Sequence, residues 1–210
     1  MNTLSRCVLM ASAIGCFSVL STSAQTNAVS FSNTTTGDAL GNPPFTLGWS
    51  FTANSNIDVV DLGVFDDSQN GLTDSHQVGL WNSSGTLLVS TTVPSGTGAT
   101  LDNQFRMVGV SSTELLAGQQ YFIGALYTSG DDPVLFPGDT TGFATAPQIT
   151  FDDATFAGGS TLTDPTASSG TDPAYFGTSF EFSATPEPGS FVLLGTGLLG
   201  VAGVLRRRLS

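Results

Sequence analysis

The stretch "DDSQNGLTDSHQ", from Asp66 to Gln77, holds the side chains best suited to binding a metal ion. Counted from its first residue, oxygen-bearing side chains stand at positions 1, 3, 5 and 9: Asp66, Ser68, Asn70 and Asp74. Gly71 follows at position 6, where a calcium loop makes its sharp turn. Calcium takes about six to eight oxygen ligands, which alternating side chains around such a turn can supply. One interpretation of this run is therefore a calcium site.

Two departures weaken the calcium interpretation and leave a structural alternative open. Ser68 stands where a carboxylate or amide is usual, and Gln77 replaces the bidentate Glu at position 12. Asp, Asn and Gly also form β-turns, in which their side chains bond to the local backbone. The run is therefore also a candidate turn between two strands, and its departures from the calcium pattern favour that alternative. The pairs Asp131-Asp132 and Asp152-Asp153 are expected to be solvated turns.

Groups that could act as catalysts are sparse. His76 is the single histidine, which excludes a site with several histidine ligands. Adjacent residues of a strand point to opposite faces, so Ser75 is poorly placed as its partner, and a structural hydrogen bond is expected for His76. A glycosidase needs two carboxyl groups across one cleft, but nothing in the sequence pairs Glu114, expected in a loop, with Glu181 in a late strand. Arg106 is expected to pair with an aspartate.

The elements that carry these residues have the pattern of strands. Short β-branched or aromatic runs alternate with clusters of Gly, Asn, Asp and Ser, and helix signals are nearly absent. This pattern predicts an all-β fold, an antiparallel β-sandwich. Strands are expected at residues 47–52, 57–65, 77–81, 87–93, 105–110, 120–127, 148–151 and 179–183, with a hairpin turn at 83–85.

Apolar residues of these strands form the expected core: Trp49, Phe51, Val60, Leu62, Val64, Leu80, Trp81, Phe122 and Ile123. If the two tryptophans were exposed, they could instead form a platform for sugar rings. Tyr175 and Phe176 lie in a Gly/Pro/Ser-rich stretch and are better candidates for glycan contact. Their alternative is an ordered late loop or edge strand.

Residues 1–24 have the parts of a secretory signal peptide: a single Arg6, an apolar core, and small residues that suit cleavage after Ala24. Lipoprotein processing at Cys16 is the less favoured alternative, because Cys16 sits inside the apolar core. Both cysteines of the chain, Cys7 and Cys16, lie in this segment. The mature domain, residues 25–184, is therefore expected to have neither disulfides nor cysteine ligands.

The C-terminal segment, residues 185–210, has a different composition. Pro186, Glu187 and Pro188 precede an apolar run over 189–205, and three arginines follow: Arg206, Arg207 and Arg208. As a helix the run would be ~25 Å long, the short limit for a bilayer core of ~30 Å. Arginines stay on the cytoplasmic side, which predicts a transmembrane helix with residues 25–184 outside the cell membrane.

A Pro-Glu-Pro motif, a short Gly/Leu-rich span and a terminal Arg cluster together resemble the PEP-CTERM sorting signal of Gram-negative bacteria that produce exopolysaccharide. The resemblance implies that an exosortase, a membrane-embedded enzyme, processes the chain at or near Pro186–Pro188. The inner membrane would then hold the protein only transiently. A eukaryotic lipid-anchor signal is disfavoured because arginines end the tail.

The central order of "DSHQVGLW", "SSGTLL", "FRMVGV" and "LLAGQQYFIGALY" is similar to uncharacterised bacterial β-sandwich domains found with this tail. That resemblance implies a jelly-roll-like fold and no particular activity. Of the 17 acidic residues only Glu187 lies outside residues 25–184, and of the five basic residues only Arg106 lies inside, so the domain carries a net charge of −15. Such acidity argues against nucleic acid and anionic membrane surfaces as partners, since both need basic residues.

Together these features predict an exported, non-enzymatic component of the cell surface or exopolysaccharide matrix. A carbohydrate-binding module with a structural calcium ion is the alternative, and a glycan hydrolase is a third class, for which no motif is present.

Overall fold

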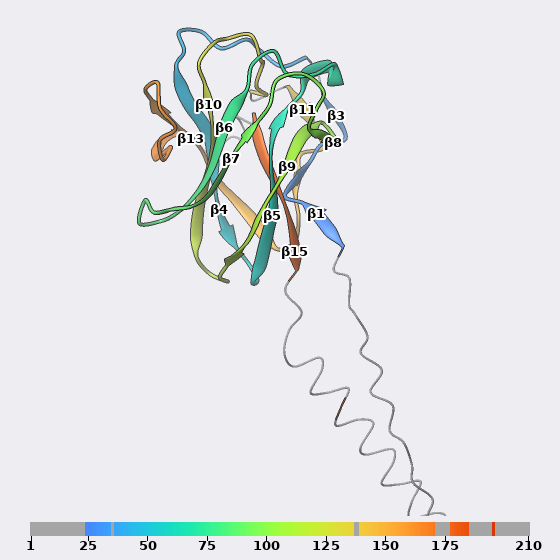
Figure 1. Cartoon of the computed structure of the whole chain (residues 1–210). Coiled ribbons are helices and arrows are strands. Elements are labelled where there is room, and N and C mark those ends of the chain that lie inside the picture. Colours follow the sequence, from blue (N-terminus) through green and yellow to red (C-terminus); the bar gives the residue numbers. More distant parts are fainter. Residues whose placement is uncertain (1–23, 35, 137–138, 171–176, 185–194, 196–210) are drawn as a thin grey trace, which may run out of the picture.

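The computed structural model describes residues 24–34, 36–136, 139–170, 177–184 and 195, and over these ranges the chain forms two facing antiparallel β-sheets (Figure 1). The first sheet has five strands in the order β1 (Gln25–Asn27), β15 (Thr178–Ala184), β5 (Ile57–Phe65), β9 (Phe105–Leu115) and β8 (Thr100–Asp102). The second has six, in the order β14 (Ala167–Gly170), β13 (Ile149–Gly158), β4 (Phe45–Ala53), β10 (Gln120–Tyr127), β6 (His76–Asn82) and β7 (Leu87–Val93).

Short ladders and a single 3-10 turn complete the described fold. Strand β2 (Val29–Ser30) pairs with β12 (Ala144–Thr145), and β3 (Asn33–Thr34) pairs with β11 (Thr140–Thr141). The 3-10 turn, Asp67–Gln69, lies between β5 and β6.

All eight predicted strands are present, and the predicted antiparallel β-sandwich is confirmed. The jelly-roll connectivity stays a prediction. One boundary was wrong in a way that matters for function. Strand β9 continues to Leu115, so Glu114 lies in a strand opposite Asp58 and not in a loop.

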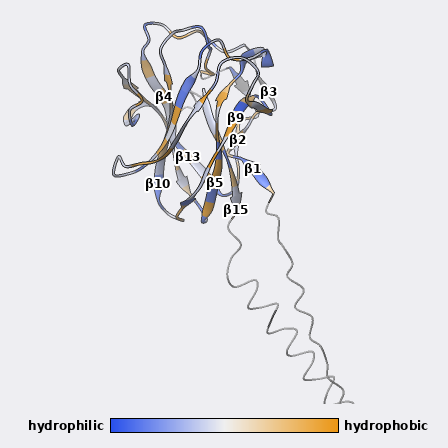
Figure 2. Cartoon of the chain, viewed as in Figure 1, coloured by the Kyte–Doolittle hydropathy of each residue, from blue (hydrophilic) through white to orange (hydrophobic). Residues whose placement is uncertain are grey.

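The core lies between the two sheets and is rich in aromatic rings. Trp49 is fully buried, its ring lies 5.8 Å from that of Phe180, and its indole Nε1 donates to the Thr178 carbonyl at 2.9 Å. Burying an indole without a partner for its N–H would be costly, so this bond lets Trp49 join the two sheets. Figure 2 shows hydrophobic residues interspersed along the strands, as the alternation of inward and outward side chains requires.

Three expected core residues face elsewhere. Trp81 of β6 lies opposite Phe122 of β10, and its ring packs over Gly79 on the outer face of the sheet. A β-bulge in β5 between Val59 and Asp61 shifts the alternation, so Val59 is fully buried and Val60 is only half-buried. In β10 the residues on either side of Phe122, Tyr121 and Ile123, point into the core, which places Phe122 on the other face.

Three glycines form a row across the outer face of the six-stranded sheet. Gly124 of β10 lies opposite Gly48 of β4 and Gly79 of β6. A Cβ atom on Gly124 would lie 3.0 Å from the ring of Pro165, and one on Gly79 would lie 2.6 Å from the ring of Trp81. The glycine row therefore leaves room for Trp81 and for the loop of residues 159–166, whose Pro165 is buried against the sheet.

The two ends of the domain leave the sandwich side by side. Strand β1 pairs with β15, with Gln25 opposite Ser183, and the termini emerge together at one end (Figure 1). Ala24 is exposed directly before β1. Residues 1–23 lie outside the described residues, as do 189–205 apart from Gly195. In the part that is described, no helix combines the length and apolar character that crossing a membrane requires.

Candidate functional site

The candidate calcium run begins with a buried carboxylate that already has a cationic partner. Asp66 Oδ2 accepts from Arg106 Nε at 2.6 Å, and the two Asp66 oxygens lie 3.1 and 3.0 Å from the backbone N–H of Gly71. Both ionic side chains are buried. The predicted pairing of Arg106 with an aspartate is therefore confirmed, and its partner is the first proposed calcium ligand.

Arg106 joins the loops around it through the rest of its guanidinium group. Its Nη1 donates to the carbonyls of Thr97 and Ala99 at 3.4 and 3.2 Å, and its Nη2 donates to the Gln69 carbonyl at 3.2 Å. A planar guanidinium with several donors suits this role, because it satisfies buried carbonyls while neutralising a carboxylate. The β5–β6 loop and the segment before β8 are thus fixed to β9 at one point.

The remaining candidate ligands do not join Asp66. Asp74 Oδ2 accepts from Ser129 Oγ at 2.5 Å, in a second network on the other side of the loop. Ser68 and Asn70 are exposed, and Ser68 Oγ donates to the neighbouring Asp67 at 3.3 Å. Within the described ranges, no group of three or more His, Cys, Asp or Glu residues is placed to hold a metal ion. Hydrogen bonds within the protein thus engage the carboxylates of Asp66 and Asp74, which the spacing offered to calcium.

The second network is centred on His76 and Asp132. The buried His76 ring lies with Nδ1 3.0 Å from the Leu126 carbonyl and Nε2 2.8 Å from Asp132 Oδ2. Asp132 also accepts from the N–H groups of Thr73 and Asp74, at 2.7 and 2.8 Å. Burial acts to raise the pKa of the Asp132 carboxyl, but the hydrogen bonds from His76 and the two N–H groups outweigh it and hold the pKa below its ordinary value.

The structure differs from the sequence-based expectation at Asp132 and agrees with it at His76. Asp132 is 5% exposed, so it is not part of a solvated turn. His76 makes the structural hydrogen bonds expected of it. The two ring nitrogens lie against Leu126 of β10 and Asp132 of the loop after β10, so His76 connects these segments. Neither nitrogen is left free for a substrate.

A third group of polar residues lies on the outer face of the five-stranded sheet. Glu181 of β15 lies opposite Asp61 of β5, and Asn27 Nδ2 of β1 donates to Asp102 Oδ1 of β8 at 3.2 Å. Glu181 is 5% exposed, and its Oε1 has no hydrogen-bond partner. Burial, together with the nearby carboxylates of Asp102 and Asp61, raises the pKa of Glu181 to about 7.

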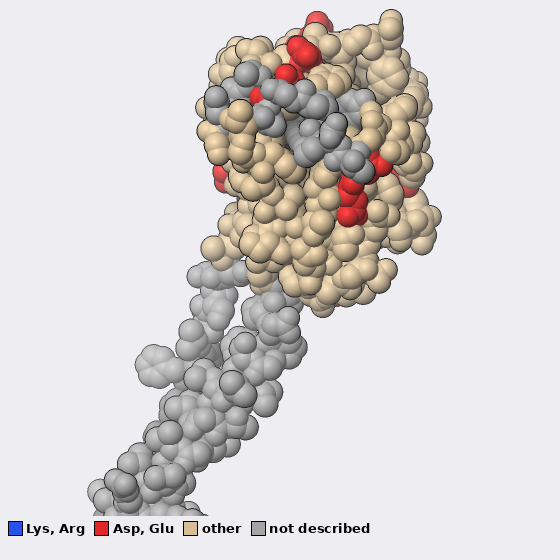
Figure 3. Space-filling model, turned by 180° about the vertical axis from the view of Figure 1, so that it is seen from behind, with Lys and Arg blue, Asp and Glu red and all other residues tan. Residues whose placement is uncertain are grey.

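Burial also raises the pKa of Asp61, although Gln25 Nε2 donates to its Oδ2 at 2.8 Å. Figure 3 shows acidic patches and no Lys or Arg over the described part of the face in view. Arg106 is the single basic residue of the domain, and it is buried against Asp66.

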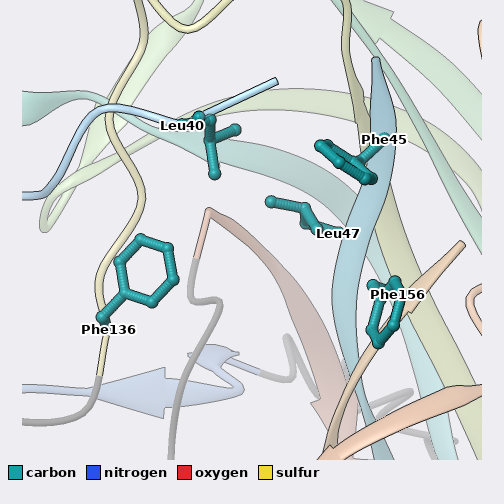
Figure 4. A pocket seen from close by; sticks show the side chains of 6 residues that line it. Leu40, Phe45, Leu47, Phe136 and Phe156 are labelled. Atoms are coloured by element: carbon teal, nitrogen blue, oxygen red, sulfur yellow. The ribbon is translucent and has the colours of Figure 1, made fainter. Parts of the chain in front are cut away.

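An apolar pocket of about 260 Å³ lies between side chains of β4, β13 and the segments before β4 and after β10 (Figure 4). It is lined by Leu40, Gly41, Phe45, Leu47, Phe136 and Phe156. Leu47 and Phe156 lie opposite each other on β4 and β13. The three phenylalanines are only half-buried. None of the described residues that line the pocket is charged, and together they offer contact with an apolar group.

A second hollow, the polar groove, lies on the outer face of the six-stranded sheet beside the 159–166 loop. Its larger part, of about 440 Å³, is lined by Ser75, Gln77, Thr92, Leu126, Thr128, Ser160 and Thr161. An adjoining part of about 300 Å³ is lined by Gln77, Ser90, Thr91, Thr92 and Leu162. Gln77 and Thr92 belong to both parts and lie opposite each other on β6 and β7. The sequence gives no local sign of this surface, because its residues come from four separate segments.

The expected glycan-binding aromatics are not available in the described fold. Trp49 and Trp81 are 0% and 4% exposed, so neither can form a sugar platform. Tyr175 and Phe176 lie outside the described residues. So do the sorting residues Pro186, Glu187 and Pro188 and the terminal arginines Arg206, Arg207 and Arg208.

Fold and termini together define the class: an antiparallel β-sandwich followed by a sorting tail. Residues 184–208 match the PEP-CTERM protein-sorting motif, which marks the chain as an exosortase-targeted secreted surface protein. Residues 32–176 match a family described as domain of unknown function (DUF4082), and the chain belongs to this family. No curated protein matches it significantly.

Proposed function

We propose that this protein is a non-enzymatic component of the cell surface or of the extracellular polysaccharide matrix. The observation that carries the proposal is the sorting motif at residues 184–208, directly after the last strand of the sandwich. On this proposal residues 1–24 are a signal peptide, 189–205 span the inner membrane for a time, and processing near Pro186–Pro188 releases the domain.

The position of the termini supports a tethered intermediate. Because β1 and β15 pair at one end of the domain, the signal-peptide junction at Ala24 and the start of the tail lie together. A domain held in this way can fold while either end is still at the membrane. Cleavage after Ala24 would leave Gln25 as the first residue, where its side chain bonds to Asp61.

A non-enzymatic role is supported by the placement of the ionisable groups. Both nitrogens of His76 are engaged, and Arg106 is buried against Asp66. Glu114 and Glu181 lie on different strands of one sheet, β9 and β15, and Glu181 is nearly covered. A glycan hydrolase would need two accessible carboxyl groups facing one cleft, so this third class is the least supported.

The test is the intact mass of the native protein recovered from the surface or medium of the producing cell. A chain that begins at Gln25 and ends near Pro186–Pro188 is the expected result. Replacing Pro186 and Pro188 by alanine should preserve the tail in the recovered protein, whereas Pro94→Ala, at an exposed proline of the domain, should not. A native mass that still includes Arg206–Arg208 would contradict the proposal.

A further inference from the structure

We infer that the polar groove on the outer face of the six-stranded sheet binds an uncharged polysaccharide strand. This inference rests on the proposed location of the protein at the cell surface, and it names the ligand class of a site that neither sequence match assigns.

The first argument is the charge of the groove. The domain carries a net charge of −15, yet none of the described residues that line the two parts of the groove is charged. The acids nearest in sequence are already engaged or directed elsewhere: Asp74 binds Ser129, and Asp164 lies near Gly85. An anionic polymer would be repelled by the domain as a whole and would find no cation here. A neutral polymer avoids this repulsion.

The second argument is the chemistry of the lining. Gln77, Ser90, Thr92 and Thr128 are exposed, and their side chains make no hydrogen bond to any described residue. An amide and several hydroxyl groups act as both donors and acceptors, which is what the hydroxyl groups of a sugar require. Leu126 and Leu162 add apolar surface beside them.

The third argument is that the rim of the groove is held in place. Ser160 and Thr161 lie in the 159–166 loop, which is fixed to the sheet at both sides of these residues. The Gly159 N–H donates to the Pro44 carbonyl at 3.3 Å, and the Thr163 N–H donates to Thr46 Oγ1 at 3.1 Å. The glycine row beneath Pro165 lets the loop lie close to the strands. A rim fixed before binding loses little conformational entropy when a ligand arrives.

None of the described lining residues is aromatic, and this limits the affinity that we expect for the polysaccharide. The described lining residues offer no ring on which a sugar could stack, so binding to a single site should be weak. Many copies of the protein in contact with one long polymer would still bind it firmly, because linked binding events multiply.

The experiment is native affinity electrophoresis of the full chain in gels that contain one polymer each. The neutral probes are dextran, laminarin and mannan, and the anionic probe is alginate. We expect at least one neutral polymer to retard the protein and alginate to leave it unchanged. Gln77→Ala combined with Thr92→Ala should lower the apparent affinity by about fivefold or more, equivalent to ~1 kcal/mol.

The matched control is Ser112→Ala combined with Gln119→Ala, which removes one hydroxyl and one amide from exposed positions elsewhere. The control should bind like the wild type, and both variants should unfold at the wild-type urea midpoint. Equal loss in both variants, binding to alginate alone, or no retardation by any neutral probe would overturn the inference. Binding of a casein digest in place of the glycans, lost in the groove variant, would assign the groove to peptides and also overturn it. None of these results changes the expected intact mass, so the proposed function is tested separately.

Discussion

Arg106 places its guanidinium between one carboxylate and three carbonyl groups, so its loss would leave Asp66 buried with no opposite charge. We expect Arg106→Met to lower the free energy of unfolding by about 3–5 kcal/mol, the usual cost of removing one partner from a buried ion pair. Urea unfolding followed by tryptophan fluorescence would measure it.

A double-mutant cycle separates the contribution of the Asp66–Arg106 ion pair to stability from the contribution of side-chain packing at Arg106. Arg106→Met combined with Asp66→Asn should recover part of the lost stability, because no buried charge then lacks a partner. If the double variant were as unstable as the sum of the two single variants, the two side chains would be acting independently.

The raised pKa of Glu181 predicts that the protein loses stability as the pH rises, a trend that most acidic groups do not produce. The pKa of about 7 for Glu181 in the folded protein lies above its ordinary value of 4.5. Between these pH values the folded state holds a proton that the unfolded state has released, so the free energy of unfolding falls as the pH rises. The decrease from pH 5 to pH 8 should be at most about 3 kcal/mol. The lowered pKa of Asp132 acts only in acid, below this window.

Replacing Glu181 by glutamine tests this at a single residue. Glu181→Gln should flatten the decrease and make the protein more stable than the wild type at pH 8, as measured by urea unfolding at several pH values. Glu114→Gln, on an exposed position of the same sheet, is the control and should keep the wild-type slope. An unchanged slope in Glu181→Gln would mean that another group causes the pH dependence.

At the scale of elements, the space around Gly48, in the glycine row of the six-stranded sheet, differs sharply from the space around Gly158. A Cβ atom on Gly48 would overlap the carbonyl oxygen of Ile123, whereas one on Gly158, at the end of β13, would meet nothing within 4 Å. Gly48→Ala should therefore destabilise the fold by about 1–3 kcal/mol or more, because the backbone must shift. Gly158→Ala should change the free energy of unfolding little. Equal effects in thermal unfolding would contradict the close approach of β4 and β10.

The strands themselves were predictable because their signals are local. Runs of β-branched and aromatic residues between turn-forming clusters predicted both ends of β5, β7 and β10 correctly. The turn at 83–85 forms as expected, with Asn82 Oδ1 accepting from the N–H groups of Ser84 and Thr86 at 3.0 Å. Each of these features depends on residues a few positions apart.

The polar networks were not predictable for the opposite reason. Asp66 meets Arg106 across 40 positions and His76 meets Asp132 across 56, so both pairings depend on how distant strands are placed. The calcium interpretation counted oxygens within one short run, and spacing alone could not reveal that a buried cation from another strand engages the first of them. The polar groove is likewise assembled from several segments, none of which has a distinctive motif.

At the scale of the whole molecule, a net charge of −15 on one small domain produces self-repulsion that salt should relieve. The screening length falls from about 30 Å at 0.01 M to about 10 Å at 0.1 M ionic strength, a range over which repulsion between distant surface acids weakens. We expect the thermal unfolding midpoint to rise with sodium chloride over this range. The buried Asp66–Arg106 pair should contribute little to the change, since buried pairs are screened much less.

The same titration distinguishes screening from specific calcium binding. Calcium and magnesium chloride at equal ionic strength should raise the midpoint equally, because the carboxylates of the Asp66–Gln77 run are held in hydrogen bonds. A ligand that binds only the folded state stabilises it in proportion to the logarithm of its concentration. Calcium that raised the midpoint well above magnesium, and continued to do so in excess sodium chloride, would show a specific site and restore the interpretation that the spacing of the run first suggested.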